Sequence, residues 1–252
     1  MLSLSVLSDM ELDVRTAFEI LLFSLILFLS YFIHSKKKPH PIIRFELFKQ
    51  KTFLISTLGG LFSRTCFGGL PFLLPLFFQI QLHQTPIQSG FAIAFIPLGA
   101  FLSRTISIFV LNTFGFKKTL LVNTSLLTLN LLFISQMHLH TPHWLSYMNL
   151  FITGICLTIQ YATLSTLCFE GISEDNLSSS TSIFSTMQQF GISLGVATGA
   201  LFLRYFSIHK NLVYQTFVSS FLGLSILSLG LIIIFSRLEP EAGQTMVKKK
   251  QM

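Results

Sequence analysis

The stretch LFSRTCFGGLPFLLPLFFQ, residues 61–79, places one charged residue, Arg64, at the head of an almost unbroken apolar run. Two glycines and two prolines are its other interruptions. It lies within a longer apolar segment, residues 53–81. A helix of roughly 20 mostly apolar residues crosses a hydrocarbon core of about 30 Å. We therefore expect a helix that spans a membrane, bends at its glycines and prolines, and carries an arginine inside it.

The whole chain has the composition of a membrane protein. Of its 252 residues, 51% are hydrophobic and 11% are charged, and the mean hydropathy is +0.69. These proportions lie far outside those of soluble domains. The apolar runs are long and continuous, without the ten-residue alternation of membrane barrel strands. We predict an all-α, polytopic membrane protein with seven transmembrane helices. They are 17–35, 53–81, 89–112, 119–137, 145–169, 179–206 and 212–236.

The first predicted helix, 17–35, differs from a signal peptide. The residues before it carry Asp9, Glu11 and Asp13 instead of a basic region, and the three lysines of 36–38 follow it without a small-residue cleavage site. We expect it to be retained.

The basic residues predict an orientation, because short cytoplasmic loops are rich in Lys and Arg. With the amino terminus outside, three basic residues lie outside, namely Arg15, Arg204 and Lys210. Two of the 17 basic residues, Arg64 and Arg104, fall within spans. All the others lie inside: Lys36, Lys37, Lys38, Arg44, Lys49, Lys51, Lys117, Lys118, Arg237, Lys248, Lys249 and Lys250. We predict a cytoplasmic carboxyl terminus.

This topology accounts for the net charge of +7 and leaves no soluble domain to present a basic patch to nucleic acid. The lysine-rich tail, residues 238–252, suits contact with anionic lipid. The first inside loop contains IIRFELF, residues 42–48. That pattern fits a short interfacial helix or an irregular loop about equally well.

We expect no enzyme activity, cofactor or metal. All ten acidic residues lie outside the spans or at their margins, and no catalytic or phosphate-binding motif is present. Cys66, Cys156 and Cys168 lack metal-binding spacing and are expected to pack inside the bundle. The loop HLHTPHW, residues 138–144, offers an H-x-H pair. Since no carboxylate or thiolate lies nearby, we predict an interfacial loop there.

Four motifs together resemble a known family. The turn LNTFGFKKTLL, residues 111–121, contains Gly115, Lys117 and Lys118 and resembles the D-R-x-G-R-R/K loop of the major facilitator superfamily, with Asn112 or Thr113 in place of its Asp. Residues 178–206 are similar to helix eleven of its EmrB/QacA drug-resistance transporters. Residues 68–100 resemble helices seven and eight of these transporters, and residues 154–167 resemble helix ten.

The resemblance implies the carboxy-terminal half of a fourteen-helix drug:proton antiporter. Residues 1–51 would hold the outer tail, a linker helix and a basic loop, residues 52–237 the six-helix bundle, and residues 238–252 the tail. It implies the bacterial inner membrane, a small amphipathic substrate if the chain is active, and a second bundle, either an amino-terminal half or another copy. A truncated, non-transporting remnant or helix-packing scaffold is the alternative, because the proton-coupling half is missing.

Candidate site residues follow from the motifs and from the intramembrane charge. Gly191, Gly195 and Gly199 recur every four residues and are expected to let a neighbouring helix approach closely. Arg64 lies about a dozen residues beyond Lys51, roughly 18 Å along a helix. It either lines a cavity or is capped inside the bundle by carbonyls or glutamines. Arg104 is shallower and can reach the headgroups. By analogy with the family, the substrate-cavity candidates are Arg64, Gln160, Tyr161, Gln188 and Gln189.

Overall fold

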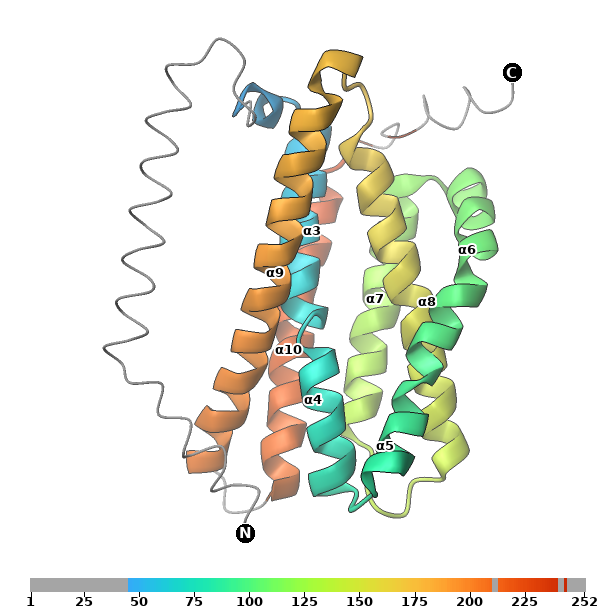
Figure 1. The fold of residues 1–252 in the computed structure, drawn as a ribbon, viewed down its shortest axis with the longest axis vertical. Coiled ribbons are helices and arrows are strands. Elements are labelled where there is room, and N and C mark those ends of the chain that lie inside the picture. Colours follow the sequence, from blue (N-terminus) through green and yellow to red (C-terminus); the bar gives the residue numbers. More distant parts are fainter. Residues whose placement is uncertain (1–44, 210–212, 240–242, 244–252) are drawn as a thin grey trace. The chain divides into compact units, whose positions relative to one another are not determined.

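The computed structural model describes the backbone of residues 45–209, 213–239 and 243, without the side chains of residues 45, 104, 105 and 209. This part of the chain is helical and contains no strand, which confirms the all-α prediction (Figure 1). Six of its helices are long and apolar enough to cross a membrane. The remaining predicted span, 17–35, which is the first in the chain, lies outside the described residues. The six are Lys51–Gln81, Pro86–Ser103, Phe116–Ser135, His143–Cys168, Glu174–Ile208 and Val213–Ser236.

The first of these spans is built from three pieces. Helix α3, Lys51–Phe67, ends at Gly68, and α4, Leu70–Leu76, begins after Gly69 and runs into a π-helical turn, Phe77–Gln81. Pro71 lies in the first turn of α4, where its missing N–H leaves no hydrogen bond broken, and Pro75 lies within the helix. The expected bend therefore takes the form of a break at the two glycines. A short 3-10 helix, Phe45–Lys49, precedes α3 in the loop where we considered an interfacial helix.

The second span starts at a strong helix signal. Thr85 accepts a hydrogen bond from the backbone N–H of Gln88, whose side chain accepts one from the backbone of Thr85. This capping box and Pro86 fix the start of α5, Pro86–Ile93, three residues before the predicted start at 89. A one-residue break at Ala94 separates α5 from α6, Phe95–Phe114.

The remaining helices are close to their predicted ranges. They are α7, Phe116–Ser135; α8, His143–Cys168; α9, Glu174–His209; and α10, Val213–Ser236. Helix α9 exceeds the predicted 179–206 at both ends. At its start, the polar residues after Glu174 extend the helix beyond the apolar run.

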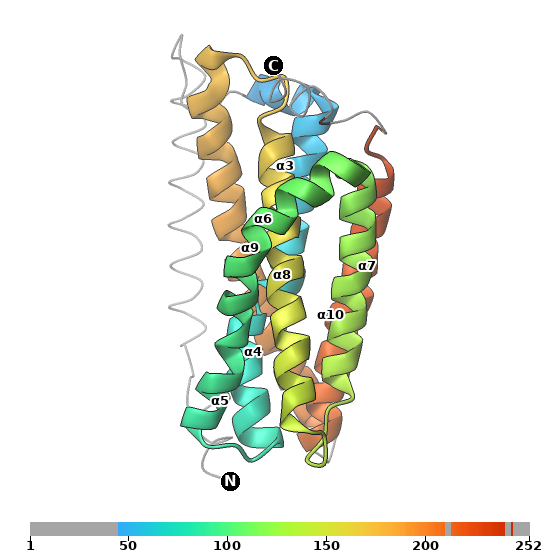
Figure 2. The same cartoon turned by 90° about the vertical axis from the view of Figure 1, so that its right-hand side faces the viewer.

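Helix α3 packs against α8, α9 and α10. Helix α8 also packs on α6 and α7, and α10 also packs on α7 and α9, so α6 and α9 flank the arrangement on different sides (Figures 1 and 2). Aromatic rings fill much of the interior. The Phe77 ring meets those of Phe217 and Phe221 edge to face, with centroids 5.6 and 5.4 Å away.

Candidate functional site

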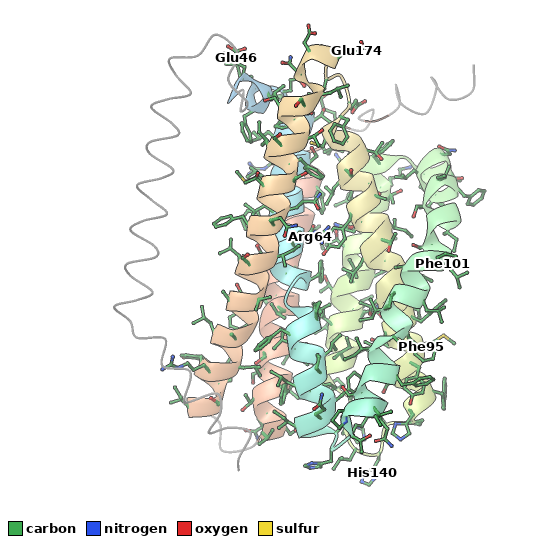
Figure 3. All side chains as sticks on the ribbon, in the orientation of Figure 1. Glu46, Arg64, Phe95, Phe101, His140 and Glu174 are labelled. Carbon is green, nitrogen blue, oxygen red and sulfur yellow. The ribbon has the colours of Figure 1, made fainter. Side chains whose placement is uncertain are left out.

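Arg64 lies where α3, α8 and α9 meet. Its side chain is half-buried, and its Nη2 donates a 2.9 Å hydrogen bond to Oε1 of Gln188 on α9. Its guanidinium carbon lies 3.7 Å from the ring centroid of Tyr161 on α8. Figure 3 places Arg64 between the ribbons of α9 and α8, far from either end of the helices. We name these three residues the Arg64 cluster. Three of the five cavity candidates therefore come together.

Two glycines of α9 allow this meeting. A Cβ at Gly191 would lie 2.7 Å from Cβ of Arg64, and one at Gly195 would lie 2.6 Å from the carbonyl oxygen of Arg64. The approach is reciprocal, since a Cβ at Gly69 would lie 2.5 Å from the carbonyl oxygen of Gly195. Small residues let two helix backbones come this close. Gly199 continues the contact farther along, 3.1 Å from Leu73 by the same measure.

The charge of Arg64 has no compensating carboxylate in the part of the chain that the structure describes. Its hydrogen bond there goes to a neutral amide, and Nε is buried without a hydrogen-bond partner. The described acidic residues are Glu46, Glu170, Glu174, Asp175 and Glu239. Figure 3 shows Glu46 and Glu174 at one end of the bundle, far from Arg64. A cation at this depth normally faces a polar cavity or a partner.

Gln160 lies apart from the Arg64 cluster, although it neighbours Tyr161 in sequence. It is completely buried, and its Nε2 donates to Thr124 at 3.1 Å and to Ser63 at 3.4 Å. Its Oε1 accepts from Nδ2 of Asn123 at 2.9 Å, and that nitrogen also donates to the carbonyl of Cys156. These bonds tie α3, α7 and α8 together. The arrangement is that of a helix-joining network, which sequence reasoning missed because Ser63, Asn123 and Thr124 carry no motif.

Gln189 lies about 100° farther round α9 than Gln188 and is exposed. It belongs to a row of exposed polar residues spaced three or four apart along that helix, which places them within about a third of the helix circumference. We call this row the α9 polar stripe; it consists of Ser178, Thr181, Ser185, Gln189 and Ser193. Hydroxyls of Thr181 and Ser193 bond carbonyls of their own helix, as they also do when they face lipid. The amide of Gln189 has no such bond among the described residues.

The basic turn lies between α6 and α7. Gly115 has φ +74°, a conformation that favours glycine, and it forms both the end of α6 and the start of α7. Its carbonyl accepts hydrogen bonds from the backbone N–H and the hydroxyl of Thr119. Lys117 is half-buried and Lys118 is exposed. The predicted hairpin is therefore made by a single residue.

The other sequence candidates are simpler. Cys66, Cys156 and Cys168 are free and buried, which confirms the packing prediction. His138 and His140 lie in the α7–α8 loop with ring centroids 6.2 Å apart. A second close helix contact was missed: Gly99 of α6 meets the carbonyl of Phe151, and Gly154 of α8 meets that of Ile96. The Arg104 side chain lies outside what the structure describes.

Comparison with known proteins agrees with this architecture. The chain is 27% identical over 229 residues to the putative multidrug resistance protein MdtD of Pectobacterium atrosepticum, covering 89% of this chain and 49% of that protein. It is 25% identical over 250 residues to the probable transport protein HsrA of Haemophilus influenzae, covering 98% and 54% respectively. The chain thus spans about half the length of the curated relatives it matches. The family model of the Major Facilitator Superfamily matches residues 15–196 and 57–250. This multi-pass membrane chain belongs to the Major Facilitator Superfamily.

Proposed function

We propose that this chain supplies the carboxy-terminal bundle, residues 52–237, of an efflux transporter of the EmrB/QacA drug-resistance type. Residues 1–51 contribute an outer tail, a linker helix and a basic loop, and residues 238–252 form a cytoplasmic tail. The bundle moves small amphipathic molecules across the bacterial inner membrane by rocking against a second bundle. That second bundle belongs to a longer form of the same polypeptide, to a separate chain or to another copy.

The observation that carries the proposal is the half-buried Arg64 cluster beside a polar face. Transfer of arginine to the middle of a membrane helix costs about 2.5 to 3.5 kcal/mol, and such residues mark substrate or ion pathways. Gln188 holds Arg64 from α9, and the α9 polar stripe follows on the exposed side of the same helix. We assign Arg64, Tyr161 and Gln188 to the substrate path and Gln189 to the side of that path that water reaches. Gln160 joins helices.

The exposed surfaces of two helices support a second bundle that packs against this one. In the spanning window of α9 only 17% of residues are buried, and in that of Pro86–Ser103 22%, against 50% for α8. Helices α9 and α6 therefore have the most surface left for lipid or another bundle. Relatives about twice as long as this chain provide the length for such a bundle.

The proposed orientation rests on the lysines that share one end of the bundle. Lys51 begins α3 and lies 3.7 Å from Glu239, just beyond α10, so these termini share one end. The α6–α7 turn with Lys117 and Lys118 lies at that end too (Figure 1). We assign it to the cytoplasm.

A second candidate function is a non-transporting scaffold. It is favoured by the tight glycine contacts and the buried Gln160 network, which hold the bundle together without any need for transport. A neighbouring reading frame upstream that encodes about six spans supports the transporter, and its absence supports the scaffold.

Accumulation of cationic, neutral and carboxylated fluorescent compounds in a pump-deficient bacterial strain tests the proposal. We expect no change when this chain is expressed alone and lower accumulation when an amino-terminal bundle encoded upstream is expressed with it. Equal accumulation in both cases favours the scaffold. Robust proton-driven efflux by the chain alone in membrane vesicles contradicts the requirement for a second bundle.

A further inference from the structure

We propose that the Arg64 cluster binds the carboxylate group of an amphipathic molecule. This inference rests on the proposed function, since it names the class of substrate for the same site. Nothing in the composition of the chain points to a particular charge on the substrate. The chemistry of the three side chains points to a negative charge.

The first argument is that the cluster offers mainly hydrogen-bond donors. Arginine has five N–H donors and no acceptor. Because Nη2 of Arg64 donates to Gln188, the amide of Gln188 has to present its oxygen to Arg64. Its NH₂ group then points away from Arg64 as a further donor. A ligand that satisfies both residues needs acceptor oxygens.

The second argument is charge. The guanidinium is permanently positive, and the described residues place no carboxylate beside it. Hydrogen bonds between a cation and an anion are roughly twice as strong as neutral ones, and a guanidinium matches the planar geometry of a carboxylate. A lipophilic cation would meet repulsion from Arg64 instead. The buried Nε–H has no hydrogen-bond partner among the described residues, so it is one donor that an anionic oxygen could satisfy.

The third argument is position and rigidity. Arg64 lies about 20 Å along the helix from Lys51, within a run of mostly apolar residues. An apolar body attached to the carboxylate matches these surroundings. The Tyr161 ring, 3.7 Å from the guanidinium carbon, and the Gln188 hydrogen bond fix the cation from two helices. A site held in this way loses little freedom when a ligand binds.

The test uses the purified full chain in phosphatidylcholine nanodiscs and three matched probes. They are 4-(pyren-1-yl)butanoate, the corresponding alcohol and the corresponding trimethylammonium compound, titrated by fluorescence. Arg64→Gln removes the charge, and Arg64→Lys keeps it without the guanidinium. Arg204→Gln is the matched control: it makes the same change at an exposed position of α9, about 24 Å from Gln188 along the helix.

We expect Arg64→Gln to weaken butanoate binding by about tenfold or more, as the loss of a charged hydrogen bond implies. Arg64→Lys weakens it less, and Arg204→Gln leaves it unchanged. Binding of the alcohol and the ammonium probe does not fall in Arg64→Gln. Butanoate binding that is independent of Arg64, or tighter binding of the ammonium probe by the unmodified chain, overturns the inference.

A second variant keeps the test decisive if Arg64→Gln fails to fold. Gln188→Glu retains the acceptor oxygen for Arg64 and supplies a carboxylate from within the chain, so the bundle keeps its contact. Butanoate binding should then be weaker by about tenfold or more than in the unmodified chain, and unchanged binding contradicts the inference. Efflux limited to cationic compounds and insensitive to Arg64 likewise overturns it while leaving the transport proposal intact.

Discussion

Gln160 shows how one polar side chain can hold three helices in an apolar environment. Its amide uses both ends, donating to α3 and α7 and accepting from Asn123. In a membrane, hydrogen bonds between helices contribute about 0.6 kcal/mol each on average, because the unfolded chain also finds partners. A network of several such bonds therefore stabilises the bundle modestly and fixes how its helices are aligned.

Gln160→Leu should lower the stability of the bundle. The apolar side chain fills a similar volume but leaves Ser63 and Thr124 without their partner, and an unsatisfied buried polar group costs about 1 to 3 kcal/mol. We expect a lower thermal unfolding midpoint in detergent. Ser125→Ala on α7 is the control, because that exposed hydroxyl donates to the carbonyl of Leu121 in its own helix and joins no second helix among the described residues. An equal midpoint for both variants would refute a stabilising role for the network.

At the scale of elements, the contact between α3 and α9 depends on residues without side chains. Gly191 and Gly195 lie against the backbone around Arg64, so that contact and the Arg64–Gln188 hydrogen bond share one origin. The glycine spacing predicted a close contact on one face of the helix. It could not identify the partner surface, because the spacing describes one helix only.

Gly191→Ala should separate α9 from α3. The added methyl group would meet Cβ of Arg64 and the carbonyl of Leu61, at 2.7 and 2.8 Å, and such overpacking costs typically about 1 to 3 kcal/mol. We expect a lower unfolding midpoint. Gly230→Ala in α10 is the matched control, since none of the described residues lies within 4 Å of its added methyl and alanine favours helix by about 1 kcal/mol. Similar losses in both variants would show that the contact is loose.

The α9 polar stripe should be reached by water in the assembled transporter. A thiol reacts with a maleimide as the thiolate, which forms in water and not in hydrocarbon. We expect Ser185→Cys and Ser193→Cys to react with a membrane-impermeant maleimide, and Ile226→Cys, on the exposed apolar surface of α10, to stay unlabelled. The native cysteines are buried and contribute little background. Labelling of the Ile226→Cys variant alone would assign the stripe to lipid.

At the scale of the whole molecule, the described lysines gather at one end of the bundle. One end holds Lys51 and the Lys117–Lys118 turn, and the opposite end holds the histidine loop with His140 (Figure 3). The retention of positive loops in the cytoplasm is a property of insertion, so it acts on the chain before the bundle packs.

The orientation can be checked on intact cells. An impermeant maleimide added outside should label His140→Cys and spare Asn112→Cys, an exposed position next to the basic turn. Lysed cells should label both. The reverse pattern on intact cells would invert the assigned topology and place the amino terminus inside.

The fold was largely predictable because hydrocarbon imposes a simple rule: a long apolar run has to satisfy its own backbone hydrogen bonds as a helix. The six spans described here follow from that rule, and local signals shifted their ends, as the Thr85–Gln88 capping box did for α5. The site was predictable only in part. Arg64 stood out as a charge in an apolar run, whereas the partners of Gln160 could not be predicted, because composition cannot tell which side of α8 faces α7.

The sequence by itself determined the membrane class, the helical spans, the family and the presence of an intramembrane cation, since each depends on local hydropathy or on short motifs. The tertiary structure decided which side chains meet that cation. Gln188 is 124 positions away from Arg64 in the chain and reaches it because two glycines bring α9 against α3. Gln189, its neighbour, lies about 100° farther round the same helix and belongs to a different surface. Only the packing of helices distant in sequence makes that distinction.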